Sequence, residues 1–292
     1  MKIAIATDTN SGITARDGKD LGIFVLAMPV NLEGTIHYEG IDITSEQLYD
    51  AMRQRRDVST SQPSPGQLME LWDGILARGY DQIVYIPMSS GLSGSCQSAV
   101  LFARDYDGRV QVVDNHRISV TQRESVISAL RLAEQGYGGE EIRDILEKYA
   151  YDASIYITVD SMEYLKKGGR VTPAAATLAT VLNLKPVLTI QGDKLDAFAK
   201  VRGMKLAQSR MIEAIRHDRE ARFKDVPESR LLIETAGTLE NGELAENWRQ
   251  QVQAEFPFAK VSYAHLPCSI ACHVGMNSVA AVIMTEGAQR AD

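Results

Sequence analysis

Apolar and polar positions follow two different periods along this chain. Short, mostly apolar runs at 2–7, 82–87, 109–114 and 154–160 are typical of buried strands. Between these runs, longer stretches repeat their apolar residues every three or four positions, which predicts amphipathic helices. Strands that alternate with helices in this way predict a parallel sheet covered by helices on both faces.

Helix start signals support this division. Thr44 opens a capping box for a helix predicted over 45–56, and Ser64 opens another directly before Pro65, a residue that suits the first position of a helix. The segment 24–40 interrupts the alternation of strands and helices and is interpreted as an extended excursion or a hairpin. Two further helices are predicted over 119–135 and 139–150.

The pattern changes after residue 160. A short helix and a Lys-Lys-Gly-Gly-Arg turn precede an alanine-rich helix predicted over 173–183. We therefore expect an α/β protein of two domains, 1–160 with a parallel sheet and 161–292 with a mixed sheet, with a ligand cleft between them. The remaining predictions are paired strands at 185–190 and 194–201 with a turn at 191–193, helices at 203–217 and 240–254, and strands at 231–235, 259–264 and 279–284.

Charge excludes one large class of function. The chain of 292 residues has a net charge of −7, whereas a nucleic-acid groove needs clustered Lys and Arg side chains.

Its three cysteines have no paired spacing, which argues against a disulfide framework. The start MKIAIATDTN lacks the plan of a signal peptide, so a cytoplasmic protein is expected.

Three windows contain no formally charged residue: 82–103, 171–184 and 261–285. The first and third are long enough to suggest membrane spans. Prolines, glycines and many hydroxyl groups interrupt both, so they are interpreted as buried segments of a soluble protein.

A serine-rich loop over 88–94, here called the serine loop, follows the strand 82–87 and leads into a helix beginning near Ser95. Ligands of doubly wound sheets bind at such strand ends, and free N–H groups at a helix start favour an anion. A phosphate-binding P-loop would need a lysine, which this window lacks. Gly91-Leu92-Ser93-Gly94-Ser95 puts serine where a nucleophile elbow has its second glycine. The loop is thus either a hydroxyl-lined carboxylate site or a turn that merely caps a helix.

Other polar residues are candidates at the same edge of the sheet. Thr60 and Ser61 belong to a second hydroxyl cluster over 60–64, which precedes a helix and taken alone is typical of a capping motif. Asp8 follows the first strand, where it either contacts a ligand or forms an Asx turn that supports the neighbouring loop. His273, near Cys268 and Cys272, has no fourth metal ligand in view, so a metal site is rejected. His116, which follows the strand 109–114, is either a functional residue or a surface loop residue.

Four segments, taken in order, resemble the DegV family of bacterial fatty-acid-binding proteins. The resemblance spans nearly the whole chain and implies two α/β domains with a long acyl chain buried inside. The loop after the strand 109–114 reads DNHRIS, where the family has a small serine-rich loop, and Met276-Asn277 follow Gly275, where the family often has Pro-Gly. The four segments are TSQPSPGQL, SSGLSGSCQSA, VDSMEYLKKGGRVTPAAATLATVLNLKPVLTI and KVRGMKLA.

Carried over position by position, the resemblance implies which residues hold the ligand. Ser93, the N–H of Gly94 and the hydroxyl of Ser61, with Thr60 as the neighbouring choice, would bind the fatty-acid carboxylate. His273 would close the head-group site, and Arg170, which ends the Lys-Lys-Gly-Gly-Arg turn, would contact the pocket or a partner. Arg202 belongs to an exposed turn that would contact a fatty acid kinase.

The resemblance therefore implies a cytoplasmic bacterial carrier without chemistry of its own and without a cofactor. It would present its bound fatty acid to the kinase for conversion to acyl phosphate, a step towards phospholipid synthesis, with transient membrane contact for lipid exchange. The main alternative is an acyl hydrolase or transferase that uses Ser93 as nucleophile. A module for small phosphorylated metabolites would retain the anion site but leave the apolar tail pocket unexplained.

Overall fold

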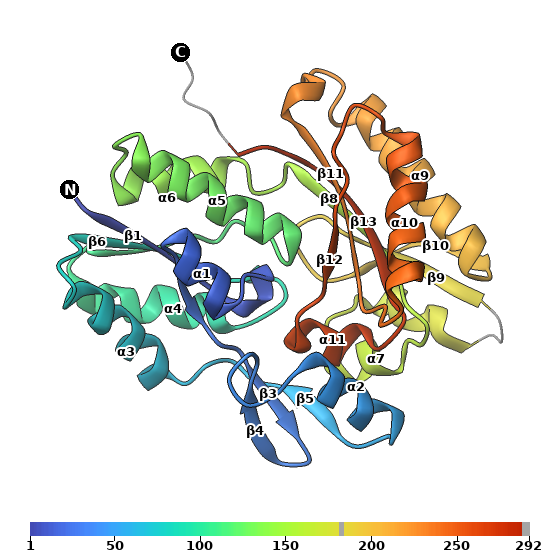
Figure 1. Cartoon of the computed structure of the whole chain (residues 1–292), viewed down its shortest axis with the longest axis horizontal. Helices are drawn as coiled ribbons and strands as arrows, with labels where there is room; N and C mark the ends of the chain where they lie inside the picture. The colour runs from blue at the N-terminus through green and yellow to red at the C-terminus, as the bar shows by residue number, and fades with distance from the viewer. Residues whose placement is uncertain (181–183, 288–292) are drawn as a thin grey trace. The chain divides into compact units, whose positions relative to one another are not determined.

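The computed structural model describes residues 1–180 and 184–287 (Figure 1). These residues form two compact units. The first unit contains Met1–Tyr151 with Pro267–Ser269 and Gly287, and the second contains Asp152–Leu266 with Ile270–Glu286. The first long stretch of the first unit thus ends at Tyr151, whereas the sequence placed a domain boundary after residue 160. That boundary stays a prediction.

A four-stranded parallel sheet forms the centre of the first unit, as the apolar runs predicted. Its strand order is β2-β1-β6-β7, and all neighbouring pairs are parallel. The edge strand β2 lies in the segment 24–40, where only an excursion or hairpin was expected. The strands are β1 (Ile3–Asp8), β2 (Phe24–Leu26), β6 (Gln82–Ile86) and β7 (Val110–Val112).

Helices cover both faces of this sheet, and each face has its own apolar core (Figure 1). Ala4, Ile83 and Tyr85 pack with Trp72 of α3 and Ala99 of α4. The alternate strand positions face the opposite way and pack against α5 and α6, because successive side chains of a strand point to opposite faces. The helices are α1 (Ala15–Leu21), α2 (Ser45–Arg53), α3 (Pro65–Leu76), α4 (Ser95–Ala103), α5 (Val120–Glu134) and α6 (Gly139–Lys148), with short 3-10 helices at Thr9–Ser11 and Arg104–Tyr106.

The two capping boxes read from the sequence are confirmed. The Thr44 side chain accepts from the Gln47 N–H at the start of α2, and Ser64 accepts from the Gln67 N–H at the start of α3. In both boxes the glutamine bonds back to the backbone of the cap residue. Each box satisfies helix-end N–H groups that would otherwise need water or a ligand.

The segment 24–40 also supplies most of a small antiparallel sheet of order β4-β3-β5. Strands β3 (Pro29–Leu32) and β4 (Thr35–Tyr38) form the expected hairpin, and β5 (Val58–Thr60) pairs with the other edge of β3. Thr60 thereby lies opposite Val30 at the end of β5. The pairing fixes where the next residues, beginning with Ser61, leave the sheet.

A six-stranded mixed sheet of order β10-β9-β8-β13-β11-β12 forms the second unit. The strand predicted at 154–160 belongs to this sheet, where β8 pairs antiparallel with β9 and β13. The strand predicted at 259–264 is observed only over Tyr263–His265, because Ala259 still belongs to a turn in which its N–H donates to the Phe256 carbonyl. The strands are β8 (Ala153–Thr158), β9 (Leu184–Ile190), β10 (Asp196–Arg202), β11 (Leu231–Gly237), β12 (Tyr263–His265) and β13 (Val279–Thr285).

The helices of this sequence region differ from expectation in two places. The alanine-rich helix predicted over 173–183 is one turn of α-helix followed by 3-10 helix up to Thr180, and its last residues lie outside the described part of the chain. The helix α11 had no sequence signal, because its apolar residues merge with the flanking charge-free window. The helices are α7 (Glu163–Gly168), α8 (Pro173–Ala176), α9 (Met204–Ala221), α10 (Gly242–Glu255) and α11 (Cys268–Val274), with 3-10 helices at Thr177–Thr180 and Glu228–Arg230.

The two faces of the mixed sheet present different sets of apolar side chains. One face packs against α9 and α10 and includes Tyr156 and Ala281. On the other face, β8 presents Ile155 and Ile157 beside apolar partners of the neighbouring strands. These partners are Val282, Ala280, Leu188 and Ile190, all of them buried. The face of the sheet opposite α9 is thus also apolar, and these side chains are buried.

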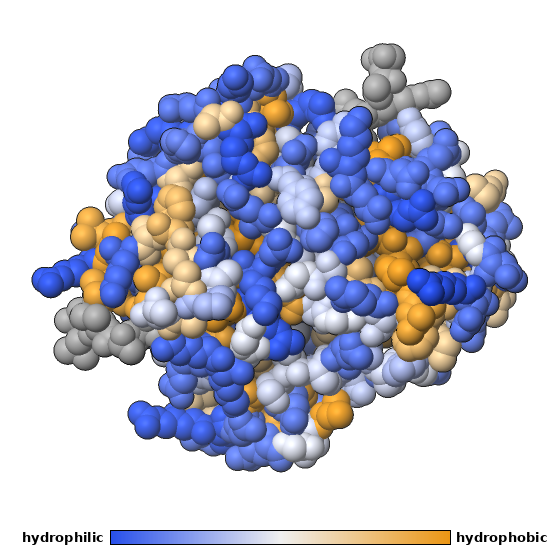
Figure 2. All heavy atoms as spheres, turned by 180° about the vertical axis from the view of Figure 1, so that it is seen from behind, coloured by the Kyte–Doolittle hydropathy of each residue, from blue (hydrophilic) through white to orange (hydrophobic). Residues whose placement is uncertain are grey.

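The outer surface is mostly hydrophilic on the face that Figure 2 shows, with hydrophobic atoms in separate patches. Exposed apolar side chains include Val100 and Leu101 of α4 and Leu206 of α9. Among the described residues, no helix combines the length and the apolar character that crossing a membrane requires.

Candidate functional site

The serine loop connects β6 to α4 and is held in part by hydrogen bonds within the loop itself. The N–H groups of Leu92 and Ser93 donate to the Ser89 carbonyl at 3.0 and 3.1 Å, and the Gly91 N–H donates to the Ser89 hydroxyl at 3.1 Å. Ser89 is buried, whereas Ser93 is partly exposed. Ser89 therefore shapes the loop, and Ser93 is the hydroxyl that a ligand can reach.

Helix α4 begins at Ser95, two residues after Ser93, and lacks the side-chain capping box that α2 and α3 have. Its cap residue Gly94 makes no side-chain hydrogen bond, and its first turn contains no acidic residue. The Ser93 hydroxyl accepts from the Ser95 N–H at 3.2 Å and can still donate its own hydrogen. This helix start combines N–H groups, a hydroxyl and the positive end of the helix dipole, a set that suits an anion.

The segment that contains Thr60, Ser61 and Gln62 lies beside this helix start. The Gln62 side-chain oxygen accepts from the Ser98 hydroxyl of α4 at 3.3 Å, and a Cβ atom added to Gly94 would lie 3.4 Å from the same oxygen. The chain segment with Thr60 and Ser61 thus runs next to Gly94, as the sequence predicted. Thr60 is partly buried and Ser61 is exposed. Their contact with a carboxylate stays a prediction.

Asp8 supports the serine loop from within the protein. Its fully buried carboxylate accepts from the N–H groups of Met88 at 3.0 Å and Asn10 at 2.9 Å, and from the Gln122 side chain at 3.1 Å. Burial raises the pKa of Asp8, and the bonds from Met88, Gln122 and Asn10 oppose that rise. The Asx turn foreseen from the sequence is present and ties β1 to the serine loop. Ligand contact by Asp8 stays a prediction.

A third loop, residues 114–119 between β7 and α5, also contacts the serine loop; the sequence analysis noted its departure from the family but named no carboxylate ligand in it. Asp114 accepts from the Ser90 N–H at 3.2 Å, and the Arg117 carbonyl accepts from the Ser89 N–H at 2.8 Å. His116, for which a surface position was one of two expectations, is partly buried and stacks on Tyr151 with ring centroids 5.0 Å apart. One sequence feature could have indicated a role of this loop in the site: it follows a strand and therefore lies at the same edge of the sheet as the serine loop.

His273 and Arg170 come together inside the second unit. A Cβ atom on Gly168 would lie 2.1 Å from the His273 Nδ1, so glycine allows the imidazole to approach the turn. The Arg170 guanidinium donates to the Gly168 carbonyl at 2.5 Å. Burial and then the Arg170 charge lower the pKa of His273 to about 4, which keeps the imidazole neutral at pH 7. His273 as a head-group ligand and Arg170 as a pocket residue stay predictions.

Arg202 is the last residue of β10, opposite Leu184, and its side chain is exposed. The sequence placed it in a turn, but the strand extends one residue further than predicted, and the left-handed Gly203 then leads into α9. Arg202 is accessible to a partner in this position, and its contact with a kinase stays a prediction.

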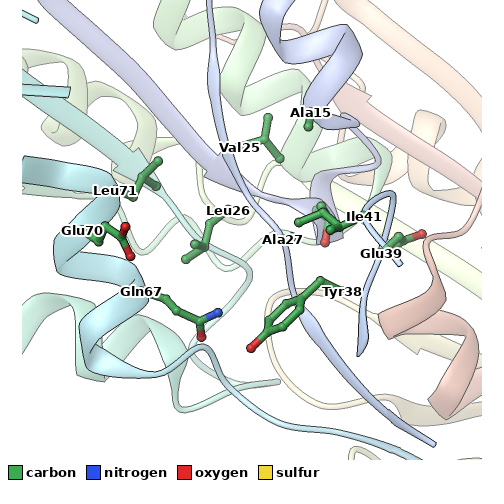
Figure 3. Close-up of a pocket in the computed structure, with 11 residues that line it drawn as sticks. Ala15, Val25, Leu26, Ala27, Tyr38, Glu39, Ile41, Gln67, Glu70 and Leu71 are labelled. Atoms are coloured by element: carbon green, nitrogen blue, oxygen red, sulfur yellow. The ribbon is translucent and has the colours of Figure 1, made fainter. Parts of the chain in front are cut away.

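A pocket of about 460 Å³ opens beside the edge strand β2 in the first unit (Figure 3). Leu26 and Ala27 form its wall, with Gln67 and Glu70 of α3 on one side and Tyr38 on the other. None of the predicted carboxylate ligands lines it. A carboxylate there would meet acidic rather than basic side chains, so this pocket is a poor head-group site.

The cysteines and acidic residues offer no metal centre in the described part of the chain, where no group of three or more His, Cys, Asp or Glu side chains is placed to hold an ion. Cys96, Cys268 and Cys272 are buried and form no disulfide among the described residues. Burial raises the pKa of Cys96 well above its usual value, so its thiol stays protonated at neutral pH.

Comparison with known proteins supports the family resemblance. The family model for DegV, described as an uncharacterised protein family, matches residues 2–286. A DegV domain-containing protein of Streptococcus pneumoniae is 31% identical and covers 96% of this chain and 98% of its own length. Another from Deinococcus radiodurans is 34% identical over 74% of this chain and 77% of its own length.

Solved structures give the same relationship. A DegV family protein of Thermus thermophilus, described by its fatty acid binding, has 30% identity and a TM-score of 0.86, covering 98% of this chain and 100% of its own. DegV of Bacillus subtilis, a fatty acid binding protein, has 24% identity and a TM-score of 0.84, covering 98% of this chain and 99% of its own. The second likeness concerns the fold alone. The α/β fold of a parallel and a mixed sheet is confirmed.

Proposed function

This chain belongs to the DegV family, and from that membership together with the site geometry we propose that it binds one long-chain fatty acid. The start of α4 carries the proposal, because it offers the Ser93 hydroxyl and the Gly94 N–H beside the segment of Thr60 and Ser61. Neutral donors of this kind suit a carboxylate. The fatty-acid binding of the Thermus thermophilus relative supports the same ligand.

The acyl chain would supply most of the affinity. Burying about fourteen methylenes at roughly 0.8 kcal/mol each contributes about 11 kcal/mol, before the cost of association. Hydrogen bonds to the carboxylate add on the order of 1.5–3 kcal/mol each. The apolar sheet face that contains Ile155, Ile157 and Val282 supports the second unit as the source of tail-binding surface.

The protein would act as a carrier and not as a hydrolase. A nucleophile elbow holds its serine in a strained backbone conformation, whereas Ser93 is not among the residues with a positive φ. Its oxygen also already accepts from the Ser95 N–H. In the carrier role, His273 would close the head-group site as a neutral donor, and a fatty acid kinase would phosphorylate the bound carboxylate.

Mass spectrometry of organic extracts tests the ligand directly. Purified protein should release a long-chain fatty acid at close to one molecule per chain. After delipidation, added fatty acid should raise the melting temperature, because a ligand that binds only the folded state stabilises it. Extracts without acyl chains, together with no thermal shift, would refute the proposal.

The kinase partner needs a separate test. Arg202→Ala should leave fatty-acid content and melting temperature unchanged while reducing acyl phosphate formation by the partner kinase, since arginine offers several fixed donors to acidic groups. Lys200 is exposed on the same strand, so Lys200→Ala is the matched control. Equal phosphorylation rates for wild type and Arg202→Ala, across a range of carrier concentrations, would reduce Arg202 to a solubilising charge.

A further inference from the structure

Asn115 is a buried amide with unused hydrogen-bonding capacity. Its side chain is 1% exposed, and neither its Oδ1 nor its Nδ2 atom has a hydrogen-bond partner among the described residues. Buried amide groups are costly unless they are bonded, and nearly all of them in native proteins have partners. An asparagine in this condition needs an explanation other than its contribution to folding.

The loop that carries Asn115 is fixed in a strained conformation. His116 and Ser119 both have a positive φ, of 53° and 56° respectively, which is unusual for residues other than glycine. The bonds from Ser89 and Ser90 anchor the loop on either side of Asn115. Strain and an unsatisfied amide thus occur together within six residues, in a loop that bonds to the serine loop through Asp114 and Arg117. Such combined costs are typical of functional sites.

Two neighbouring loops contribute further donors. Asn10 is 2% exposed, and its Oδ1 accepts from the Ser269 hydroxyl at 2.7 Å while its Nδ2 has no partner in the described chain. Ser95, in the first turn of α4, is 6% exposed, and its hydroxyl is likewise without a partner there. The Asn10 carbonyl accepts from the Ser119 N–H at 2.9 Å, which joins its loop to that of Asn115. All three loops end at the same edge of the parallel sheet.

We propose that Asn115 is a further head-group ligand and donates its amide N–H to an oxygen of the bound carboxylate. This inference rests on the proposed function and extends its site from the serine loop to residues 114–119. A carboxylate has several acceptor positions, more than Ser93 and Gly94 alone can satisfy. A hydrogen bond to the ligand would satisfy the buried amide. The bonds from Ser89 and Ser90 would hold the strained loop, and with it the amide, in place before the ligand binds.

The substitution Asn115→Leu tests the role, because leucine has a similar size and no polar atoms. Replacing an unsatisfied buried group with an apolar one should leave the ligand-free protein as stable as wild type, or more stable. Its Kd for hexadecanoate should nevertheless rise about 10- to 100-fold, the usual effect of losing a hydrogen bond to a charged group. Stability would be measured by urea denaturation of delipidated protein, and Kd by titration.

Three comparisons make the test specific. Hexadecanol has the same tail without the carboxylate, and Asn115→Leu should bind it as wild type does. Asn115→Ser retains a hydroxyl donor and should fall between leucine and wild type in Kd. Thr158→Val removes another buried hydroxyl without a partner in the described chain, in β8 of the second unit, and should leave the Kd for hexadecanoate unchanged.

An unchanged Kd for hexadecanoate in folded Asn115→Leu would overturn the inference, and so would an equal loss of affinity for hexadecanol, which would indicate an altered tail pocket. If leucine prevents folding, Asn115→Ser with wild-type affinity would overturn it equally. These results leave the proposed function intact. Failure of the wild-type protein to bind hexadecanoate would instead remove the proposed function, and this inference with it.

Discussion

Helices α3 and α4 start close to the same hydroxyl-rich segment, but their first turns are built differently. At α3, Ser64 and Gln67 exchange hydrogen bonds in a complete capping box. At α4, the cap residue Gly94 contributes no side-chain bond. The same donors that the protein satisfies at α3 are thus available to a ligand at α4. We therefore propose the start of α4, and not that of α3, as the place where the head group binds.

The largest expected effect comes from adding a charge at α4. Gly94 has a right-handed backbone and a Cβ atom there would make only ordinary contact, so Gly94→Asp should fold. Its carboxylate would repel the ligand head group, and the Kd for hexadecanoate should rise about 100-fold or more. Gly66→Asp is the matched control in the first turn of α3, where a Cβ atom meets open space. If both variants bind equally well, the two helix starts do not differ in function.

A smaller effect is expected from removing the accessible hydroxyl. Ser93→Ala should weaken hexadecanoate binding by roughly 1–3 kcal/mol, because a hydrogen bond to a charged group is lost. Ser98→Ala, one turn further along α4, removes a hydroxyl that bonds to Gln62 and should change the Kd little. An assay with p-nitrophenyl esters should detect no hydrolysis. Turnover by wild type that disappears in Ser93→Ala would favour the hydrolase alternative.

The smallest effect should come from the capped helix. Ser64→Ala removes one N-cap and should lower the free energy of unfolding by about 1 kcal/mol. Its Kd for hexadecanoate should match that of wild type, measured by titration beside urea denaturation. A loss of affinity comparable with that of Ser93→Ala would show that the two helix starts form one binding unit.

Many individual helices and strands could be predicted from the sequence, because interactions between residues close in the chain define them. Thr44 and Ser64 marked helix starts, and the runs at 2–7 and 82–87 marked central strands, since capping and burial depend on residues a few positions apart. The strand at 154–160 was recognised, but the sheet to which it belongs was not. Partner choice depends on residues such as Val282 that are far away in sequence.

In the candidate site, too, the sequence indicated the local features and the tertiary structure decided the long-range contacts. The sequence by itself determined that Ser93 and Gly94 lie at a strand end before a helix, and its motifs identified the family. Only the tertiary structure decided that Asp8 holds the Met88 N–H, that Gln62 lies beside Gly94, and that Asn115 is buried without a partner among the described residues. The physical reason is that burial and hydrogen-bond satisfaction depend on the loops that converge in space, and no local pattern records which groups remain unsatisfied when they meet.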